Sequence, residues 1–310
     1  LCRVRLGTKS TIEESRIERF IDIGARNRTL MPIPLKYYGA HTGRWSGLDA
    51  VNFQNLPSRD KAKKALKNAV LAPDEHTIVN SDSSQIEARI LAWLAGETDL
   101  VKSFREGKDV YSEFASKIYK RPVTKADAME RFVGKTCILG LGYGTGGLKL
   151  QHTLRTGAIK VDLDETECKN IVDTYRTTYG EIKDLWRSAD ILIDTLNDWT
   201  DENHPFNFGN DSVLVTPEGI KLPNELYIRY PELRDDGSEK EKRMVYTSRK
   251  GKVSLWGGVV VENVVQALAR IVIGEQMIAI AKRYRPCLTQ AISKLPTTIS
   301  RDQTFKELSD

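Results

Sequence analysis

The chain of 310 residues is 40% hydrophobic and 29% charged, and 47 Lys and Arg residues against 42 Asp and Glu residues give a net charge of +5. This composition is typical of a globular protein and excludes a disordered chain, a collagen and a small disulfide scaffold. The length favours two domains, and the weak positive charge permits an anionic partner without requiring one.

No CxxC pair occurs among the four cysteines, which are Cys2, Cys137, Cys168 and Cys287. We therefore expect free thiols in a reducing compartment. We expect no signal peptide. The most apolar stretch, 259–281, contains Glu262, Arg270 and Glu275, which disfavour a membrane span. Because the chain begins with Leu1 rather than Met, we expect a piece of a longer protein.

The first third of the chain alternates short elements with turns. Periodic apolar residues predict helices over 11–27, 58–70 and 83–96, and an apolar run predicts a strand over 76–82. Prolines or a glycine end each helix. The basic and aromatic stretch 35–59 holds too many glycines for a long helix, so we expect turns there.

The rest of the chain separates into blocks. Several helices are expected up to about residue 200, interrupted by the glycine-rich residues 140–147. Turns and alternating strands follow over 205–258, then a long helix over 259–284 and a weakly patterned tail. Because helical and strand blocks are segregated, the fold class is predicted to be α+β.

The strand over 76–82 ends on Asp82, and a helix follows it directly. A carboxylate at a strand end can hold Mg²⁺, which prefers one or two carboxylates together with substrate phosphate oxygens. Taken alone, the segment favours a simple helix cap, since Ser84 and Glu87 have the spacing of a capping box.

Four residues spaced by four form one stripe on an expected helix: Arg131, Lys135, Leu139 and Tyr143. Two cations one turn apart, followed by an aromatic ring, suit a triphosphate with a base stacked behind it. By itself the stripe is more typical of a solvated charged face, with Leu139 in the core and Gly144 as the C-cap.

The glycines at 142–147 also match the dinucleotide-binding pattern GxGxxG, with Asp162 twenty residues after the first glycine and an apparent strand over 159–163. This pattern needs a strand before Gly142, whereas residues 131–137 favour a helix. A dinucleotide-binding (Rossmann) enzyme is therefore a remote alternative.

Two further sets of polar residues suit contacts with a nucleic acid. The first comprises residues 41–44, Asn52, Gln54, Asn55 and Arg59, and the second comprises Asn263, Gln266 and Arg270 on the late helix. Basic and amide side chains interleaved with turns are what contacts to phosphates and minor-groove base edges require, although polar loops are common. The amides of the late helix need partners, either in a nucleic-acid groove or in an internal network.

Together these segments resemble family A DNA polymerases, the bacterial DNA polymerase I type, and most closely their phage-encoded members. Residues 82–96 resemble motif A (D-[YS]-S-Q-I-E-x-R), and residues 131–144 resemble motif B (R-x-x-x-K-x-x-x-[FYL]-x-x-x-Y-G). Residues 42–59 are similar to the palm stretch T-G-R-x-S…N-x-Q-N-[IL]-P-x-R, and residues 257–270 to the phage-type helix G-G-x-x-V-E-N-x-x-Q-A-[IL]-A-R. Four matches in the right order over about 28–285 make the resemblance specific.

The resemblance implies two Mg²⁺ ions, held by the Asp82 carboxylate and the Ser83 backbone carbonyl. Asp82 and Lys135 are the implied catalytic residues, the lysine through protonation of the leaving pyrophosphate. Glu87 is implied to be a steric gate against a ribose 2′-OH, and Gln85 to support the primer terminus or the nucleotide pocket.

The implied reaction is in-line attack of a primer 3′-OH on the α-phosphorus of a nucleotide, with two metals stabilising the attacking and leaving oxygens. The residues implied to bind the nucleotide are Arg59, Gln85, Glu87, Arg131, Lys135, Leu139 and Tyr143. Those implied to touch the DNA minor groove are Arg44, Gln54, Asn55 and Gln266.

Three positions depart from the family pattern. Leu139 stands where bacterial members have Phe, and Tyr111 stands where they place a His. Neither difference argues against the resemblance. Motif C, a His-Asp turn, should follow the late helix, yet no His occurs after His204, and Asp302 lies in an unrelated context. The second metal-binding carboxylate is therefore missing, and we expect very slow or no nucleotide incorporation by this chain.

The implied architecture is the right-hand polymerase fold, with a palm of antiparallel sheet and helices, mostly helical fingers and a largely absent thumb. We expect a connector at the end of the thumb over 1–27, palm over 28–96 and 245–310, and fingers over 97–244. The expected function of the intact parent is template-directed DNA synthesis in phage replication, on primer–template DNA and dNTPs, in the cytoplasm and without a membrane partner. The alternative is a catalytically inactive DNA- or nucleotide-binding remnant.

Overall fold

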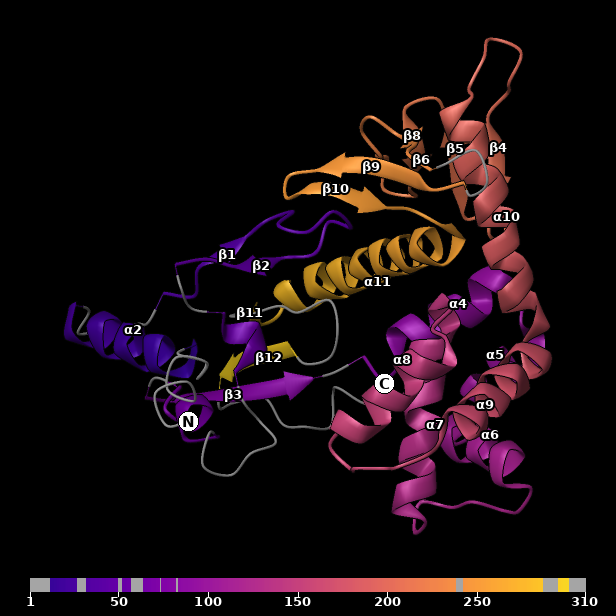
Figure 1. The fold of residues 1–310 in the computed structure, drawn as a ribbon. Helices are drawn as coiled ribbons and strands as arrows, with labels where there is room; N and C mark the ends of the chain where they lie inside the picture. The colour runs from indigo at the N-terminus through magenta and orange to yellow at the C-terminus, as the bar shows by residue number, and fades with distance from the viewer. Residues whose placement is uncertain are drawn as a thin grey trace, which may run out of the picture. The chain divides into compact units, whose positions relative to one another are not determined.

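The structure is a computed structural model that describes residues 12–26, 32–49, 52–56, 64–72, 74–81, 83–237, 242–286 and 295–300. The chain divides into two compact units (Figure 1), which we call unit 1 and unit 2. Unit 1 comprises residues 1–84 and 270–310, and unit 2 comprises residues 85–269. Helices and antiparallel strands occur in both units, so the predicted α+β class is confirmed. The boundaries given above for palm and fingers stay predictions.

Unit 1 is built on a three-stranded antiparallel sheet in the order β11–β12–β3. β3 (His76–Ser81) pairs with β12 (Leu295–Ser300) so that Leu295 lies opposite Ser81, and β12 pairs in turn with β11 (Arg285–Pro286). The other elements of this unit are α2 (Ile12–Arg26), β1 (Leu35–Lys36), β2 (Ser46–Gly47), the 3₁₀ helix η1 (Phe53–Asn55), α3 (Lys64–Asn68) and the second half of α11 (Gly257–Ala281).

A small apolar cluster joins α2 to η1 within unit 1. Ile23 and Phe53 are buried at its centre, and the rings of Phe20 and Phe53 lie 5.3 Å apart. Partly buried apolar residues surround them, namely Ile33, Leu35, Leu56 and Val70. Of the apolar residues that predicted a helix over 11–27, Phe20 and Ile23 pack in this cluster, whereas Ile17 and Ile21 are exposed.

Unit 2 begins with a group of helices. These are α4 (Ile86–Ala95), α5 (Thr98–Arg105), α6 (Val110–Tyr119), α7 (Ala128–Gly140), the 3₁₀ turn η2 (Leu141–Tyr143), α8 (Gly147–Thr156), α9 (Glu165–Thr178) and α10 (Gly180–Asn197). Three buried rings form a cluster between α6 and α9, with Tyr175 5.5 Å from Phe114 and 4.9 Å from Tyr179. Gly134 lets α6 and α7 approach closely, because a Cβ atom at this position would lie 2.1 Å from the carbonyl oxygen of Tyr111.

Two antiparallel sheets follow the helices of unit 2, as the alternating pattern over 205–258 predicts. One has the order β4–β5–β6–β7, with strands Phe206–Phe208, Val213–Thr216, Gly219–Lys221 and Tyr227–Ile228. The other has the order β10–β9–β8, with β8 at Arg234–Asp235, β9 at Met244–Ser248 and β10 at Gly251–Ser254. Trp256 connects β10 to α11 and packs beside Gly144 and Gly258, where added Cβ atoms would each lie 2.2 Å from its ring.

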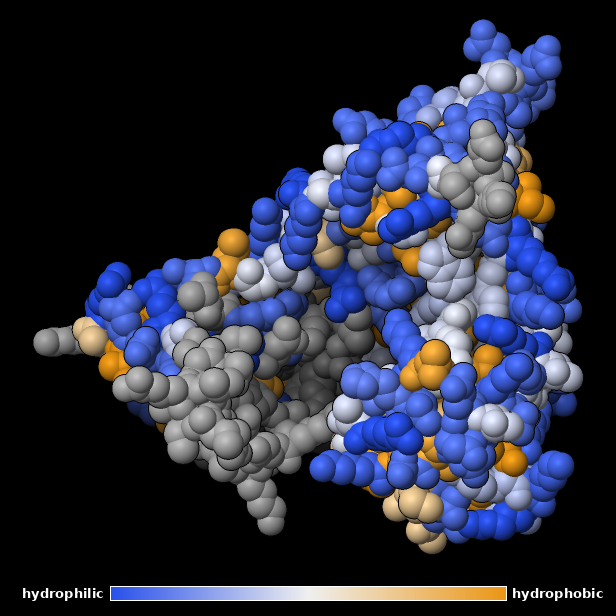
Figure 2. All heavy atoms as spheres, viewed as in Figure 1, coloured by the Kyte–Doolittle hydropathy of each residue, from blue (hydrophilic) through white to orange (hydrophobic). Residues whose placement is uncertain are grey.

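In the part of the chain that the structure describes, α11 is the one helix long and apolar enough to cross a membrane. A core helix passes the same test, and Val260, Val261, Val264 and Val265 of α11 are fully buried among other residues of the protein. Figure 2 shows hydrophilic residues over most of the visible face, with apolar residues in separate patches.

Two local predictions are wrong. The helix after β3 begins at Ile86, and its N-cap, Gln85, has a left-handed backbone and makes no side-chain cap, so Ser84 and Glu87 do not form the expected capping box. Residues 159–163 do not form a strand, and Asp162 instead pairs with Arg155 on α8 at 2.7 Å. A short apolar run cannot by itself distinguish a strand from a loop that packs on a helix.

Candidate functional site

The four-residue stripe predicted from the sequence lies on α7 and the turn that follows it. Arg131 and Lys135 are half-buried and one helical turn apart, and Leu139 is 42% exposed rather than in the core. Helix α7 ends at Gly140, and Tyr143 closes the 3₁₀ turn η2. The helix in front of the glycines excludes the dinucleotide-binding alternative, which requires a strand at that place.

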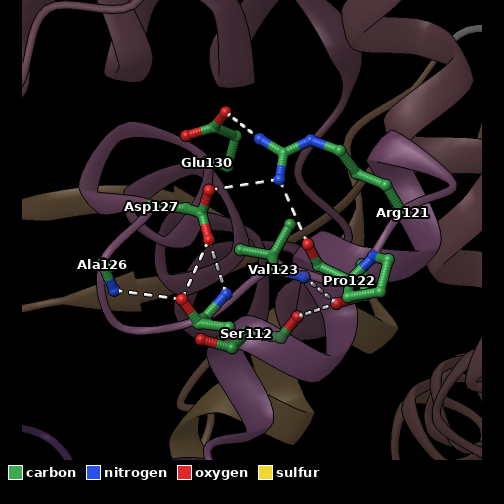
Figure 3. A network of polar contacts seen from close by, with 9 residues as sticks. Ser112, Arg121, Pro122, Val123, Ala126, Asp127 and Glu130 are labelled. Atoms are coloured by element: carbon green, nitrogen blue, oxygen red, sulfur yellow. Dashed lines mark hydrogen bonds and ion pairs between the residues drawn. The ribbon is translucent and has the colours of Figure 1, made fainter.

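A polar network fixes the start of α7 (Figure 3). One oxygen of Asp127, the N-cap residue, accepts hydrogen bonds from the backbone N and the hydroxyl of Thr124 at 2.8 and 3.0 Å. Its other oxygen pairs with Arg121 at 3.1 Å, and Arg121 also binds Glu130 in the first turn of the helix. The bonds from Thr124 and the pairing with Arg121 hold the pKa of Asp127 below its ordinary value. The network thereby stabilises the helix terminus nearest Arg131.

Arg131 is held by a bidentate ion pair with Asp109, the residue before α6. Nε and Nη2 of the arginine lie 2.6 and 3.2 Å from the two carboxylate oxygens, and the Ser112 hydroxyl donates to the same carboxylate at 2.9 Å. Burial opposes ionisation of Asp109, but the hydrogen bonds from Arg131 and Ser112 outweigh it and hold the pKa of the carboxyl below its ordinary value. The pair fixes the direction of the guanidinium and leaves Nη1 without a contact to Asp109.

The ring of Tyr111 lies beneath both cations of the stripe. It is 5.4 Å from the Arg131 guanidinium carbon and 6.0 Å from the Lys135 ammonium, close enough for cation–π attraction. Tyr111 is buried and hydrogen-bonded to Gln85, and burial raises the pKa of its hydroxyl despite that bond. The close approach at Gly134 brings the ring to this position, so a neutral phenol supports two adjacent positive charges.

Tyr143 lies near the carboxylates of Glu87 and Glu262. Burial raises the pKa of the Tyr143 hydroxyl well above its ordinary value, and the two negative charges raise it further. Beside this tyrosine is a cavity of about 320 Å³, whose charged residues are Lys149 from α8 and Glu262 from α11. Its other lining residues include Thr136, Gly140 and Trp256.

The structure therefore brings together, within unit 2, most of the residues predicted to bind a nucleotide. Gln85, Arg131 and Lys135 converge on Tyr111, and Glu87 lies close to Tyr143. Sequence reasoning missed Asp109, although an acidic residue just before a predicted helix and two residues from Tyr111 was a usable signal.

The predicted metal site lies only partly in the described residues. Ser83 donates its hydroxyl to Oε1 of Gln276 on α11 at 2.9 Å, which ties the segment after β3 to that helix. Asp82 and Arg59 lie outside the described residues. Among the residues that the structure does describe, no three His, Cys, Asp or Glu side chains gather as a metal site would require.

The residues predicted to touch DNA divide between the two units. In unit 1, Arg44 lies in the loop between β1 and β2, and Gln54 and Asn55 lie in η1. The backbone N of Gln54 donates to Asn52 Oδ1 at 3.0 Å. In unit 2, Gln266 donates to Glu262 Oε1 at 3.0 Å. Asn263 donates to the hydroxyl of Tyr230 at 3.1 Å and Arg270 binds Tyr37, so the three residues of α11 predicted to contact a nucleic acid all have partners inside the chain.

Comparisons with known proteins show which family the chain resembles. A sequence model described as DNA polymerase family A matches residues 24–193. A DNA polymerase of Bacillus phage SP02 is 29% identical to this chain, over 76% of the chain and 42% of the phage protein. A thermostable DNA polymerase I of Thermus aquaticus is 36% identical over 36% of this chain and 14% of that protein.

A solved structure shares the fold. It is described as the POL domain of Pol1 from M. smegmatis in complex with DNA primer-template and dNTP, and it matches with a TM-score of 0.61 at 22% identity, over 89% of this chain and 42% of that one. The chain thus spans less than half the length of the phage polymerase and of the solved chain that it matches.

Proposed function

The chain belongs to DNA polymerase family A, and from this premise we propose that it is the portion of such an enzyme that binds primer–template DNA and a deoxynucleoside triphosphate. For the intact parent we propose template-directed DNA synthesis in phage replication, in the host cytoplasm. The similarity to the polymerase of Bacillus phage SP02 supports the phage assignment.

One observation carries the nucleotide-binding proposal, namely the pair of cations Arg131 and Lys135 held over Tyr111. Phosphate oxygens bind to guanidinium and ammonium groups through charge-assisted hydrogen bonds, the strongest class in water. Because Asp109 occupies Nε and Nη2 of Arg131, the arginine has Nη1 to offer to a phosphate, while Lys135 supplies a second charge one turn along the helix.

Tyr143 and Glu87 would then contact the nucleoside part of the ligand. The aromatic ring of Tyr143, at the end of the stripe, offers a face on which a base can stack. The half-buried Glu87 next to it would restrict the space at the sugar, which is how pocket shape discriminates a ribose from a deoxyribose. Leu139 and Arg59 complete the proposed nucleotide contacts.

Proposed Mg²⁺ ligands are the Asp82 carboxylate and the Ser83 backbone carbonyl. This donor set does not fit a pair of metal ions. After α11 the acidic residues are Asp302, Glu307 and Asp310, and none of them follows a His as motif C requires, so no second carboxylate is assigned to a metal beside Asp82. Metal-dependent turnover is therefore not part of the proposal for this chain, and binding without efficient chemistry is its second candidate function.

A direct binding experiment tests the proposal. A fluorescent dATP analogue is titrated into the chain with a primer–template present, and Arg131→Gln and Lys135→Gln are compared with the unchanged chain. Each substitution is expected to weaken binding about 10- to 100-fold, the range for loss of a hydrogen bond to a charged group. Lys102→Gln on α5, which removes an exposed cation remote from the stripe in sequence, is the matched control. Equal losses in all three variants, or no binding by the unchanged chain, would refute the proposal.

A further inference from the structure

Arg270 on α11 is surrounded by three aromatic rings of one loop in unit 1. Its guanidinium carbon lies 5.3 Å from the ring centre of Tyr37, 5.4 Å from that of Tyr38 and 5.0 Å from that of Trp45. Its Nη2 also donates a hydrogen bond to the Tyr37 hydroxyl at 3.0 Å. A single cation therefore contacts both ends of the segment 37–45, which is more than 220 residues away in sequence.

The segment 37–45 is closed at its base by backbone contacts. β1 and β2 pair with Lys36 opposite Ser46, and inside the loop Ala40 donates to the carbonyl of Arg44 at 3.1 Å. Gly43 has φ +79° and donates to the carbonyl of Ala40 at 3.0 Å. These bonds shape the loop, and Arg270 joins it to the rest of the unit.

Arg44 lies between two residues whose positions depend on this contact. Trp45, the next residue, is one of the three rings over Arg270. Gly43, the preceding residue, packs against the ring of Tyr38, which a Cβ atom at position 43 would approach to 2.7 Å. Displacement of either ring would therefore move the backbone on one side of Arg44.

The chemistry of this contact requires an arginine. A planar guanidinium can lie against several ring faces and donate a hydrogen bond at the same time, whereas an ammonium acts as a compact, strongly hydrated point charge. The Nε of Arg270 is buried and has no hydrogen-bond acceptor within the described residues, as expected where ring faces surround the group.

We infer that Arg270 is a positioning residue, which holds the loop 37–45 against α11 so that Arg44 is presented to the primer–template. The inference rests on the proposed function where it concerns DNA binding, but the effect of Arg270 on the loop conformation can be tested without DNA. Arg270 stabilises one conformation of the loop and thereby removes the entropy cost of ordering it when DNA binds.

The first test is limited trypsin digestion of the whole chain, with products identified by mass spectrometry. In Arg270→Gln and Arg270→Lys, cleavage after Arg44 is expected to become about fivefold faster or more, because local opening governs cleavage of a protected loop. Cleavage after Lys250, in the exposed β9–β10 turn, serves as the internal reference and is expected to stay constant. Lys282→Gln, just beyond the end of α11, is the matched control for the lost charge.

The second test is a double-mutant cycle on primer–template affinity, followed by fluorescence anisotropy. Arg44→Gln and Arg270→Gln are each expected to weaken binding about tenfold, and the double variant no more than either single one, because the two residues act as one unit. Arg270→Lys keeps the charge and is expected to show most of the loss, which a purely electrostatic role would not produce. Circular dichroism and the thermal midpoint confirm that each variant is folded.

The outcomes separate the inference from the proposed function. Unchanged cleavage after Arg44 in both Arg270 variants would overturn the inference, as would losses of affinity that multiply in the double variant. Absence of primer–template binding by the unchanged chain would instead overturn the proposed function, and the digestion would still decide whether Arg270 holds the loop. Should Arg270→Gln fail to fold, Arg270→Lys and Tyr37→Phe, which removes only the hydrogen-bonding hydroxyl, provide the same comparison.

Discussion

The proposed phosphate-binding residues lie in unit 2 and the proposed metal ligands in unit 1, and we call the two sets the phosphate-binding half and the metal-binding half. They differ in what the chain supplies to each. On α7, Arg131 has an ion-pair partner, and Arg131 and Lys135 share an aromatic support and a fixed helix start, all within unit 2. For the metals the proposed ligands are the Asp82 carboxylate and the Ser83 carbonyl. We therefore expect affinity for a triphosphate and catalysis on it to be separable properties of this chain.

The reason for the difference lies in how each half is assembled. A helix places residues four apart on one face, so Arg131 and Lys135 need no remote segment to bring them together. A metal pair needs carboxylates from segments distant in sequence. The sheet that could supply one is present, since β12 pairs with β3 up to Leu295 opposite Ser81, but β12 itself carries no acidic residue.

The largest effect expected from this comparison concerns primer extension. With Mg²⁺ or Mn²⁺, the chain is expected to extend a primer at least about 10³-fold more slowly than an intact relative, because metal stabilisation of the transition state contributes several kcal/mol. Product is measured by gel electrophoresis of a labelled primer, with the phage SP02 polymerase as the reference. Extension at a comparable rate would show that the metal-binding half is complete, and the two halves would then not differ.

A second prediction tests whether the phosphate-binding half depends on the close packing of α6 and α7. Gly134→Ala would place a Cβ atom 2.1 Å from the Tyr111 carbonyl oxygen and is expected to cost about 2–3 kcal/mol of stability through overpacking. Gly140→Ala, on the same helix with no atom within 4 Å of the added Cβ, is the matched control and is expected to change stability by less than about 0.5 kcal/mol. Urea denaturation measures both, and equal effects of the two substitutions would contradict the prediction.

Much of the fold could be predicted because its signals are local. The apolar periodicity of α2 and α11, the apolar run of β3 and the glycine that ends α4 at Gly96, with φ +75°, all act within a few residues. The predicted strand over 159–163 failed because a short apolar run gives no information on its partners. In the structure Val161 is buried, and its backbone N donates to the Leu154 carbonyl of α8.

For the candidate site, the sequence indicated the residue types but not their partners. The stripe on α7 followed from its spacing, whereas Asp109 contributes through a contact over 22 residues that no periodicity records. The contact between Arg270 and the loop 37–45 joins residues that are even further apart in the sequence. Long-range pairs such as these depend on tertiary packing, which single-sequence patterns do not contain.

The smallest expected effect concerns the ion pair that holds Arg131. Asp109→Asn is expected to reduce stability by about 1–2 kcal/mol at pH 7, the range for a hydrogen-bonded charged pair that is partly buried. The pKa of Asp109 is lowered in the folded chain, so the pair contributes fully above the ordinary carboxyl value of 3.8 and its contribution is lost as the pH falls through the lower folded value. Urea midpoints at pH 7 and pH 5 should therefore show the same difference between variant and unchanged chain, and midpoints near pH 3 a smaller one.

Asp162→Asn is the matched control for this measurement. Asp162 pairs with Arg155 at 2.7 Å, close to the 2.6 Å between Arg131 and Asp109, but the Asp162 side chain is 82% exposed. Solvent and salt screen such a pair, and its loss is expected to cost less than about 0.5 kcal/mol. An equal cost for both substitutions would mean that the pair at Asp109 is as weak as a surface contact. Arg131 would then be free to turn away from Lys135, and the phosphate-binding half would be no better preorganised than the metal-binding half.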